Sequence, residues 1–107
     1  MNIKTNNAVK CALACAGLKT VSDPEIGLNI VDLGLIYAVN FDEAIKQVQC
    51  IMTLTTSFCP MGESIMSNVM MALEMYFPGY DVDIHLVFDP PWEYEMISEA
   101  GRIFLGR

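Results

Sequence analysis

The sequence predicts a small single-domain α+β protein in which one three-stranded sheet packs against helices, in the order α-β-β-α-β-α. Three observations lead to this prediction. The chain has 107 residues, which is enough for one domain with a modest core. Its hydrophobic fraction of 53% is typical of a folded globule rather than a disordered chain. Segments that alternate between apolar and polar residues are interleaved with segments of helical periodicity.

The N-terminal part is predicted to contain a short tail and one helix. Residues 1–7 are polar and are expected to form a flexible end, so that the domain covers residues 8–107. The alanine-rich segment 8–18 reads as a helix capped by Asn6 or Asn7. Because this helix is apolar almost all round, we expect it to be buried on most sides.

A loop, a turn and two strands follow. Proline disfavours helix in the residue before it, so residues 21–27, with Pro24 at their centre, read as a loop. Residues 29–34 are expected to form a short turn. Residues 35–41 and 48–55 alternate as strands of a hairpin. One face of the second strand would carry Val48, Cys50, Met52 and Leu54, and the other Gln49, Ile51, Thr53 and Thr55.

The second half of the chain is predicted to contain two helices around a third strand. The central helix runs from Pro60 to about Phe77 and is stopped by Pro78 and Gly79. Residues 81–88 alternate as a strand, and a last helix is expected over 98–106. The apolar row of the central helix would consist of Ile65, Val69, Leu73 and Tyr76.

Charge and composition exclude several classes of partner. Thirteen acidic and six basic residues give a formal net charge of −7, and no basic stripe exists, so nucleic acids and anionic membrane surfaces are not expected to bind. No apolar run is long enough to cross a bilayer. We therefore expect a cytoplasmic protein whose four cysteines are free thiols. With one histidine and no Cys-x-x-Cys pair, a structural zinc site has little support.

The strongest candidate for chemistry is Cys59. Pro60 follows it at the expected first position of the central helix, which makes Cys59 the predicted N-cap. A thiol facing the positive end of a helix dipole ionises more readily, and the thiolate is the form that attacks electrophiles and binds soft metals. Thr55 and Thr56 precede it and could donate hydrogen bonds to the sulfur. A small, buried and inert cap is the alternative interpretation.

Other candidates also have two interpretations. Asp23 and Glu25 flank Pro24, either as an ordinary turn or as carboxylates that approach Cys59 as base or hard ligand. Trp92 follows two prolines and would be a core plug or a lid over a pocket. Cys11 and Cys15 lie four residues apart and are expected either to pack in the core or to share a ligand. His85 is expected to be a solvated histidine beside Asp83. Met71 and Met75 are expected to form a dimer or partner surface.

The order of three motifs resembles the SufT-like/PaaD-like family of iron–sulfur cluster assembly factors. The resemblance covers about residues 8–107. The first motif joins Asp23–Gly27 to Asn29–Tyr37, and the second is Met52–Pro60, with its Thr-Thr-x-x-Cys-Pro element. The third comprises Phe88–Trp92, Ile97–Arg102 and Leu105–Gly106. Two departures are visible: Ser57-Phe58 stands where many members carry Pro-Gly, and the chain ends at Arg107 without the cysteine-rich tail of PaaD proteins. The latter argues against a phenylacetate-oxygenase assignment.

The resemblance implies a compact α+β fold, often dimeric, that acts in the maturation of iron–sulfur proteins. Its pocket residues correspond to Asp23, Glu25, Thr55, Thr56, Cys59 and Trp92. The leading hypothesis is a non-enzymatic factor without a tightly bound cofactor, whose Cys59 transiently holds iron, a cluster or a client. Its partners would be an assembly scaffold, client apo-proteins or a second copy. A small enzyme with Cys59 as nucleophile and Asp23 or Glu25 as base, and a purely structural interaction module, are the alternatives.

Overall fold

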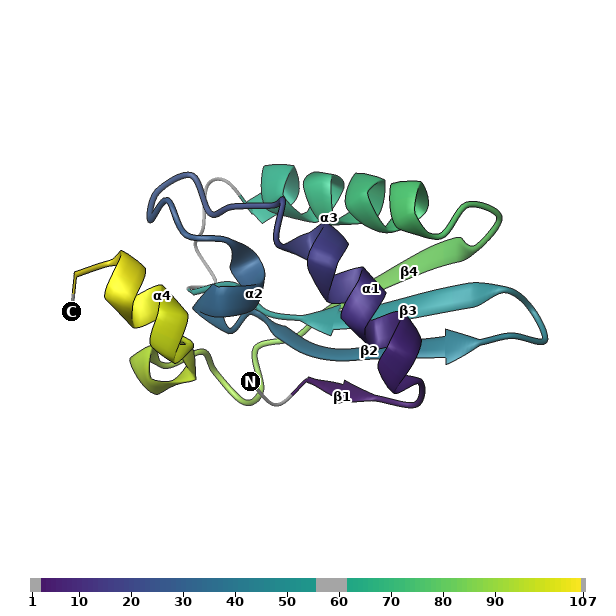
Figure 1. Ribbon diagram of the computed structural model, residues 1–107, viewed down its shortest axis with the longest axis horizontal. Helices are drawn as coiled ribbons and strands as arrows, with labels where there is room; N and C mark the ends of the chain where they lie inside the picture. The colour runs from purple at the N-terminus through teal and green to yellow at the C-terminus, as the bar shows by residue number, and fades with distance from the viewer. Residues whose placement is uncertain (1–2, 56–61, 107) are drawn as a thin grey trace.

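A four-stranded sheet forms the centre of the protein, as a computed structural model that describes residues 3–55 and 62–106 shows (Figure 1). The strands lie in the order β1-β2-β3-β4. β2 and β3 form an antiparallel hairpin, and β1 and β4 flank it in parallel pairings. The strands are β1 (Lys4–Thr5), β2 (Ile36–Asp42), β3 (Gln47–Met52) and β4 (Asp81–Leu86).

The predicted three-stranded sheet is wrong, because β1 adds a fourth strand. Lys4 pairs with Ala38 and Thr5 with Val39. The side chain of Asn6 continues this pairing, since its amide donates to the Phe41 carbonyl (2.8 Å) and its oxygen accepts from the Phe41 amide (2.9 Å). A strand of two residues is too short to show an alternation of apolar and polar side chains. It lies inside residues 1–7, so a domain boundary at residue 8 omits it.

The helices are α1 (Ala8–Leu18), α2 (Ile30–Leu33), α3 (Gly62–Tyr76), the 3₁₀ helix η1 (Tyr94–Met96) and α4 (Glu99–Phe104). Helices were predicted at α1, α3 and α4, whereas α2 occupies a segment predicted as a turn and η1 was not predicted. Asn7 caps α1 by accepting from the Lys10 amide, and Ser98 caps α4 by accepting from the Gly101 amide. The predicted start of the central helix at Pro60 lies outside the described residues. None of the helices in residues 3–55 and 62–106 has the length and apolar character needed to cross a bilayer.

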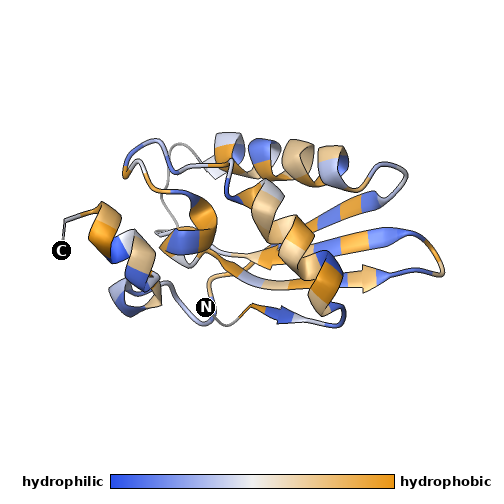
Figure 2. Ribbon diagram, viewed as in Figure 1, coloured by the Kyte–Doolittle hydropathy of each residue, from blue (hydrophilic) through white to orange (hydrophobic). Residues whose placement is uncertain are grey.

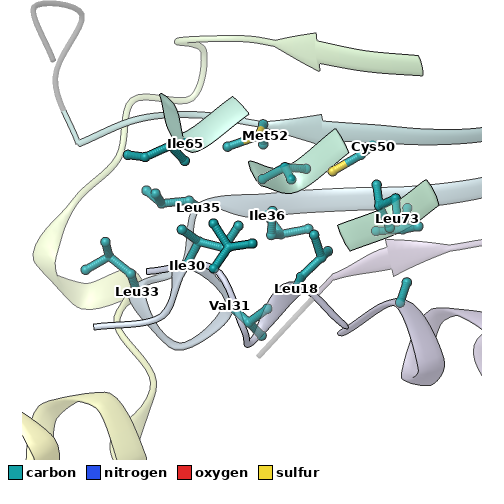
Figure 3. Packing of buried hydrophobic residues seen from close by; sticks show 14 of the residues in the cluster. Leu18, Ile30, Val31, Leu33, Leu35, Ile36, Cys50, Met52, Ile65 and Leu73 are labelled. Atoms are coloured by element: carbon teal, nitrogen blue, oxygen red, sulfur yellow. The ribbon is translucent and has the colours of Figure 1, made fainter. Parts of the chain in front are cut away.

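The core lies between the sheet and the two long helices, α1 and α3 (Figure 3). The predicted alternation of β3 is confirmed, because Val48, Cys50 and Met52 are buried beneath the helices. Thr53 was expected on the opposite face from these residues but is completely buried. The chain leaves the strand after Met52, and the Thr53 amide donates to the Leu35 carbonyl (2.9 Å), so strand alternation no longer applies.

The expectation that α1 is buried on most sides is wrong. Its inner face is covered, since Ala14 and Leu18 have no exposed surface, but Val9 is 82% and Leu13 46% exposed. Figure 2 shows that the outward side of α1 is largely apolar. A helix in the outer layer of a two-layer fold has one face toward solvent whatever its composition. The sequence of an alanine-rich helix therefore does not show which of its faces is buried.

Every backbone carbonyl of helix α2 accepts a hydrogen bond. Gly34, in the left-handed conformation at φ 86°, allows its own amide to donate to the Val31 carbonyl and the Leu35 amide to donate to the Ile30 carbonyl, both at 3.1 Å. The two remaining carbonyls accept from the C-terminal segment. The Asp32 carbonyl accepts from the Ser98 amide, and the Leu33 carbonyl from the Trp92 indole, both at 2.7 Å. α2 is thus the anchor for the C-terminal segment.

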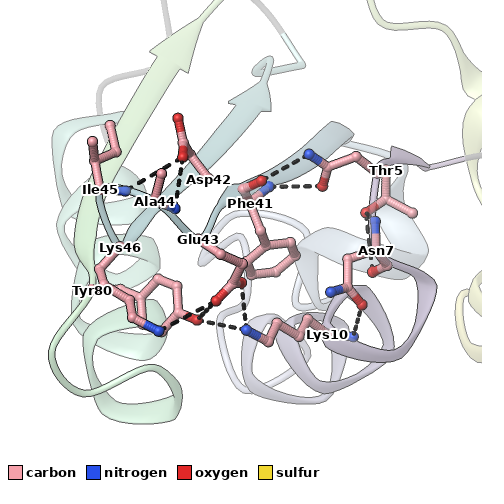
Figure 4. Close-up of polar contacts among 11 residues, drawn as sticks. Thr5, Asn7, Lys10, Phe41, Asp42, Glu43, Ala44, Ile45, Lys46 and Tyr80 are labelled. Atoms are coloured by element: carbon pink, nitrogen blue, oxygen red, sulfur yellow. Dashed lines mark hydrogen bonds and ion pairs between the residues drawn. The ribbon is translucent and has the colours of Figure 1, made fainter.

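A polar cluster ties three segments at the opposite end of the sheet (Figure 4). The Glu43 carboxylate pairs with the Lys10 ammonium of α1 and accepts a hydrogen bond from the Tyr80 hydroxyl (2.6 Å), which precedes β4. The hydrogen bond from Lys10, followed by that from Tyr80, lowers the pKa of Glu43 to about 2. The hydrogen bonds of Lys10 with Glu43 and with the Tyr80 hydroxyl raise the pKa of Lys10 above its ordinary value. The cluster therefore joins α1 to the β2–β3 turn and to the start of β4.

Replacing Gly34 by alanine should destabilise the fold strongly. An added Cβ would clash with the Met96 backbone oxygen, and the left-handed conformation is strained for alanine. Gly79 is the matched control, because it has φ 87° but nothing within 4 Å of the added Cβ. Urea unfolding should show a loss of about 1 kcal/mol for Gly79→Ala and about 3 kcal/mol or more for Gly34→Ala. Equal losses of stability in the two variants would show that the Met96 backbone moves away from the added Cβ without a cost in free energy.

Replacing Glu43 by glutamine should lower the melting temperature at neutral pH. A carboxyl with a depressed pKa stabilises the fold above its ordinary pKa of 4.5, and that contribution is lost as the pH falls toward the folded-state value of about 2. The difference in melting temperature between wild type and Glu43→Gln should therefore shrink across this range. Glu74→Gln, at an exposed position of α3, controls for the loss of one charge. A pH-independent difference would contradict the ion-pair account.

Candidate functional site

The candidate site includes the loop between α1 and α2, which Asp23 holds closed. The Asp23 carboxylate accepts a hydrogen bond from the Glu25 amide (2.9 Å), and the Asp23 carbonyl accepts from the Gly27 amide (2.7 Å). The Asp23 amide donates to the Leu28 carbonyl (3.0 Å). Asp23 is only 2% exposed, and a buried carboxylate is retained only where hydrogen bonds offset its desolvation. These hydrogen bonds of Asp23 are the ones expected if the loop is a turn.

Asp23 and Glu25 do not have the same environment, although the sequence placed them together. Asp23 lies inside the protein, whereas Glu25 is exposed. Pro24 separates them, and the loop reverses direction over the following residues to the Ser22–Asn29 bridge. Asp23 is therefore the member of this pair that is enclosed with its neighbours, and Glu25 is accessible to a partner.

Trp92 is tied to the end of α2 by its indole. Its indole N–H donates to the Leu33 carbonyl at 2.7 Å, and the half-buried ring packs against the hydrophobic core. A buried tryptophan usually needs a partner for its N–H, and the carbonyl at the end of α2 supplies one. Of the two predicted roles, these contacts fit the core plug.

The second motif is described only in part. Thr55 is half-buried at the end of the segment that follows β3. Thr56, Cys59 and Pro60 lie outside the described residues, so the N-cap position and acidity of the Cys59 thiol stay predictions. Figure 1 shows that the end of β3 and the start of α3 lie at the same end of the molecule as the segment between α1 and α2.

The other three cysteines lie in or against the core. Burial raises the pKa of the Cys50 thiol to about 12. Burial, together with the neighbouring Cys11, raises the pKa of the half-buried Cys15 to about 11. Both thiols are protonated near neutral pH and thus poor nucleophiles. Among residues 3–55 and 62–106, no three histidine, cysteine, aspartate or glutamate side chains converge on a metal position. Cys11 is buried in the core cluster and Cys15 packs against it, which is the arrangement expected for core residues.

His85 lies on the solvated face of the sheet, as predicted. Its Nε2 lies 2.7 Å from Asp83 Oδ2 and 3.4 Å from the Gln49 side-chain nitrogen. All three residues point away from the face that carries the core, since Val48, Cys50, Val82 and Ile84 alternate with them. This exposed pair does not belong to the loop that Asp23 closes.

Sequence reasoning missed the network that joins the first and third motifs. The Asp32 carboxylate accepts from the Asn29 amide group (2.7 Å) and from the Ser98 hydroxyl (2.8 Å). The Asn29 hydrogen bond is the main cause of the lowered pKa of Asp32, and the Ser98 hydrogen bond adds to it. Asn29 three residues before Asp32, and Ser98 before an acidic first turn, are visible cap signals. Nothing in the spacing indicates that the two caps share one carboxylate.

The fold has a counterpart among solved structures. A crystal structure of a domain of unknown function from Bacillus anthracis superposes with a TM-score of 0.83 and 37% sequence identity, covering 94% of this chain and 98% of that one. The chain belongs to the family of iron–sulfur cluster assembly proteins, which it matches over residues 15–85. The resemblance drawn from the three motifs is thereby confirmed.

Two curated relatives support the same family. The Fe-S protein maturation auxiliary factor SufT of Staphylococcus aureus (strain USA300) is 42% identical over 87 residues, which are 80% of this chain and 97% of that protein. The Fe-S protein maturation auxiliary factor YitW of Bacillus subtilis (strain 168) is 39% identical over 89 residues, covering 83% of this chain and 86% of that protein. The similarity therefore extends over nearly the whole domain.

Substitutions at Asp23 should separate its hydrogen bond from its charge. Asparagine keeps an oxygen that accepts from the Glu25 amide, so Asp23→Asn should unfold within about 0.5 kcal/mol of wild type. Asp23→Ala leaves that amide without its partner and should cost about 1–2 kcal/mol. Chemical denaturation measures both, and Glu25→Ala, at an exposed position, is the control. If Asp23→Ala were as stable as Asp23→Asn, the Asp23 carboxylate would not be what holds the loop closed.

Proposed function

We propose that this protein is a cytoplasmic auxiliary factor in the maturation of iron–sulfur proteins, which uses the Cys59 thiolate to hold iron, a cluster or a client transiently. The observation that carries the proposal is the match to maturation factors over at least 80% of the chain. In this account iron or the cluster is cargo and not a resident cofactor.

The chemistry of the ligand set supports transfer rather than storage. A single soft thiolate with one or two carboxylates cannot saturate an iron–sulfur cluster, because such clusters are held by several thiolates. Incomplete ligation suits a factor that must release its cargo. The raised pKa values of Cys15 and Cys50 also support Cys59 as the thiol in use, since the two core thiols are protonated near neutral pH.

The buried Asp23 suggests a specific contribution of charge. A carboxylate beside a thiolate raises the thiol pKa and so opposes activation by the helix dipole. The combination is useful when a cation lies between the two groups and neutralises both. We therefore propose that Asp23 favours cation capture at Cys59, while Thr55 and Thr56 donate hydrogen bonds to the sulfur. No observation among the described residues favours the alternative of a cysteine-dependent enzyme.

The partners in this proposal are an assembly scaffold or client apo-proteins, together with a second copy of the chain. Met71 and Met75 of α3 are 62% and 77% exposed, which supports a contact surface on this helix. Methionine side chains are flexible and adapt to several partner surfaces. Met71 and Met75 lie about 14 and 20 Å along the axis from the first residue of α3, so a partner bound there would need to extend along the helix to reach the thiol.

Replacing Cys59 by serine should abolish function while leaving the fold intact. Serine is itself a strong N-cap residue, so the melting temperature should stay close to that of wild type. Iron and sulfide retained after anaerobic purification, and the activity of an iron–sulfur client enzyme in cells that lack the wild-type protein, should both fall to background. Cys15→Ser is the matched control and should behave as wild type in both measurements. Full client activity with Cys59→Ser would favour a purely structural interaction module.

A further inference from the structure

A cleft opens between the sheet and the C-terminal segment. It has a volume of about 630 Å³ and lies between β1, β2, the end of α2 and the η1–α4 segment. None of Asp23, Glu25, Thr55 and Trp92 lines it. Its floor consists of apolar residues that are otherwise buried: Val31, Ile36, Ala38 and Ile97. We call it the β2–η1 cleft.

The walls of the β2–η1 cleft are held in place by contacts within the protein. The Tyr37 hydroxyl donates to the Pro90 carbonyl at 2.7 Å and lies 3.7 Å from Met96 Sδ. Met96 in turn packs against Gly34, where no side chain larger than hydrogen fits. The Ser98 amide donates to the Asp32 carbonyl and fixes the start of α4. A cleft with fixed walls binds without a large cost of ordering.

Charged groups lie at the rim of the cleft and not on its floor. Lys4 of β1 stands on one side, and the exposed carboxylates of Glu95 and Glu99 stand on the other. Within the described parts of the chain, neither carboxylate takes part in an ion pair. In the same residues the one buried side-chain polar atom without a partner is Arg102 Nε, which does not belong to the lining.

This distribution of groups suits a peptide better than a small polar metabolite. Sites for small molecules place a few polar groups inside the pocket, where they converge on the ligand. A protein-binding hot spot instead has an apolar centre that takes one large side chain and a polar rim. With a formal net charge of −7 and two carboxylates at one rim, the complementary partner is basic.

We propose that the β2–η1 cleft binds an extended segment of a partner protein that inserts one large apolar side chain onto the floor formed by Val31, Ile36, Ala38 and Ile97. A lysine or arginine close to that side chain in the segment contacts Glu95 and Glu99. Only the identity of the partner, as a scaffold or client of iron–sulfur maturation, rests on the proposed function. The binding of the segment itself does not.

A random heptapeptide library displayed on phage and panned against the full chain tests this proposal. Enriched peptides should contain an aromatic or large aliphatic residue within about two positions of lysine or arginine, the separation at which both side chains span one cleft. A fluorescein-labelled synthetic copy should bind in anisotropy titrations. Replacing its large apolar residue by serine should weaken binding more than about tenfold.

The rim is tested with the double variant Glu95→Gln/Glu99→Gln, whose changes are at exposed positions and leave the core intact. Binding of the enriched peptide should weaken about fivefold or more, as expected for two solvent-exposed ion pairs, and should fall with rising salt. Glu74→Gln, which removes a charge on α3, is the control and should bind as wild type. An absence of enriched peptides, or equal binding by the double variant and Glu74→Gln, would overturn the proposal. Cys59→Ser should bind the peptide as wild type does, so a failure of this test is distinguishable from a failure of the proposed function.

Discussion

The four residues of α2 impose the constraint on which much of the remaining structure depends. A helix end leaves its last four carbonyls without partners within the helix, and in the four residues of α2 these are all of the carbonyls. Two are satisfied locally through the left-handed Gly34. The other two accept from Ser98 and Trp92, and the hydrogen bond to Trp92 spans 59 residues of chain. The C-terminal segment is thus held by these two carbonyls. Without it they would be buried with no hydrogen-bond donor, which costs free energy.

This constraint also connects the three motifs. The loop closed by Asp23 leads into the N-cap of α2 at Asn29, so the loop and the anchor are one continuous segment. The Leu35 carbonyl that follows α2 accepts from the Thr53 amide, which fixes where the chain leaves β3 on its way to Thr55. The β2–η1 cleft arises from the same arrangement, because Gly34 allows Met96 to approach closely. The candidate site and the cleft are therefore two consequences of how one short helix is completed.

Sequence reasoning recovered the elements whose signals are local. A cap at Asn6 or Asn7, the helix over 8–18, the last helix from about Ser98 and the alternation of β3 follow from propensity and periodicity that neighbouring residues express. It failed where a distant contact decided the outcome. β1 depends on pairing with β2 and on the Asn6 side chain, and Thr53 is buried because of Leu35. For the candidate site, the residue types and their order were accessible, whereas the burial of Asp23 and the exposure of Glu25 were not.

The sequence by itself determined the class of fold, the family and the residues that carry its motifs, because periodicity, capping and motif order are properties of neighbouring positions. The tertiary structure decided which carboxylate is enclosed, that the Trp92 indole donates to the Leu33 carbonyl, and that Asp32 joins Asn29 to Ser98. It also decided which face of α1 meets water and where a cleft opens. The physical reason is that burial and the pairing of polar groups depend on segments far apart along the chain, and local sequence carries no record of which distant segment will satisfy them.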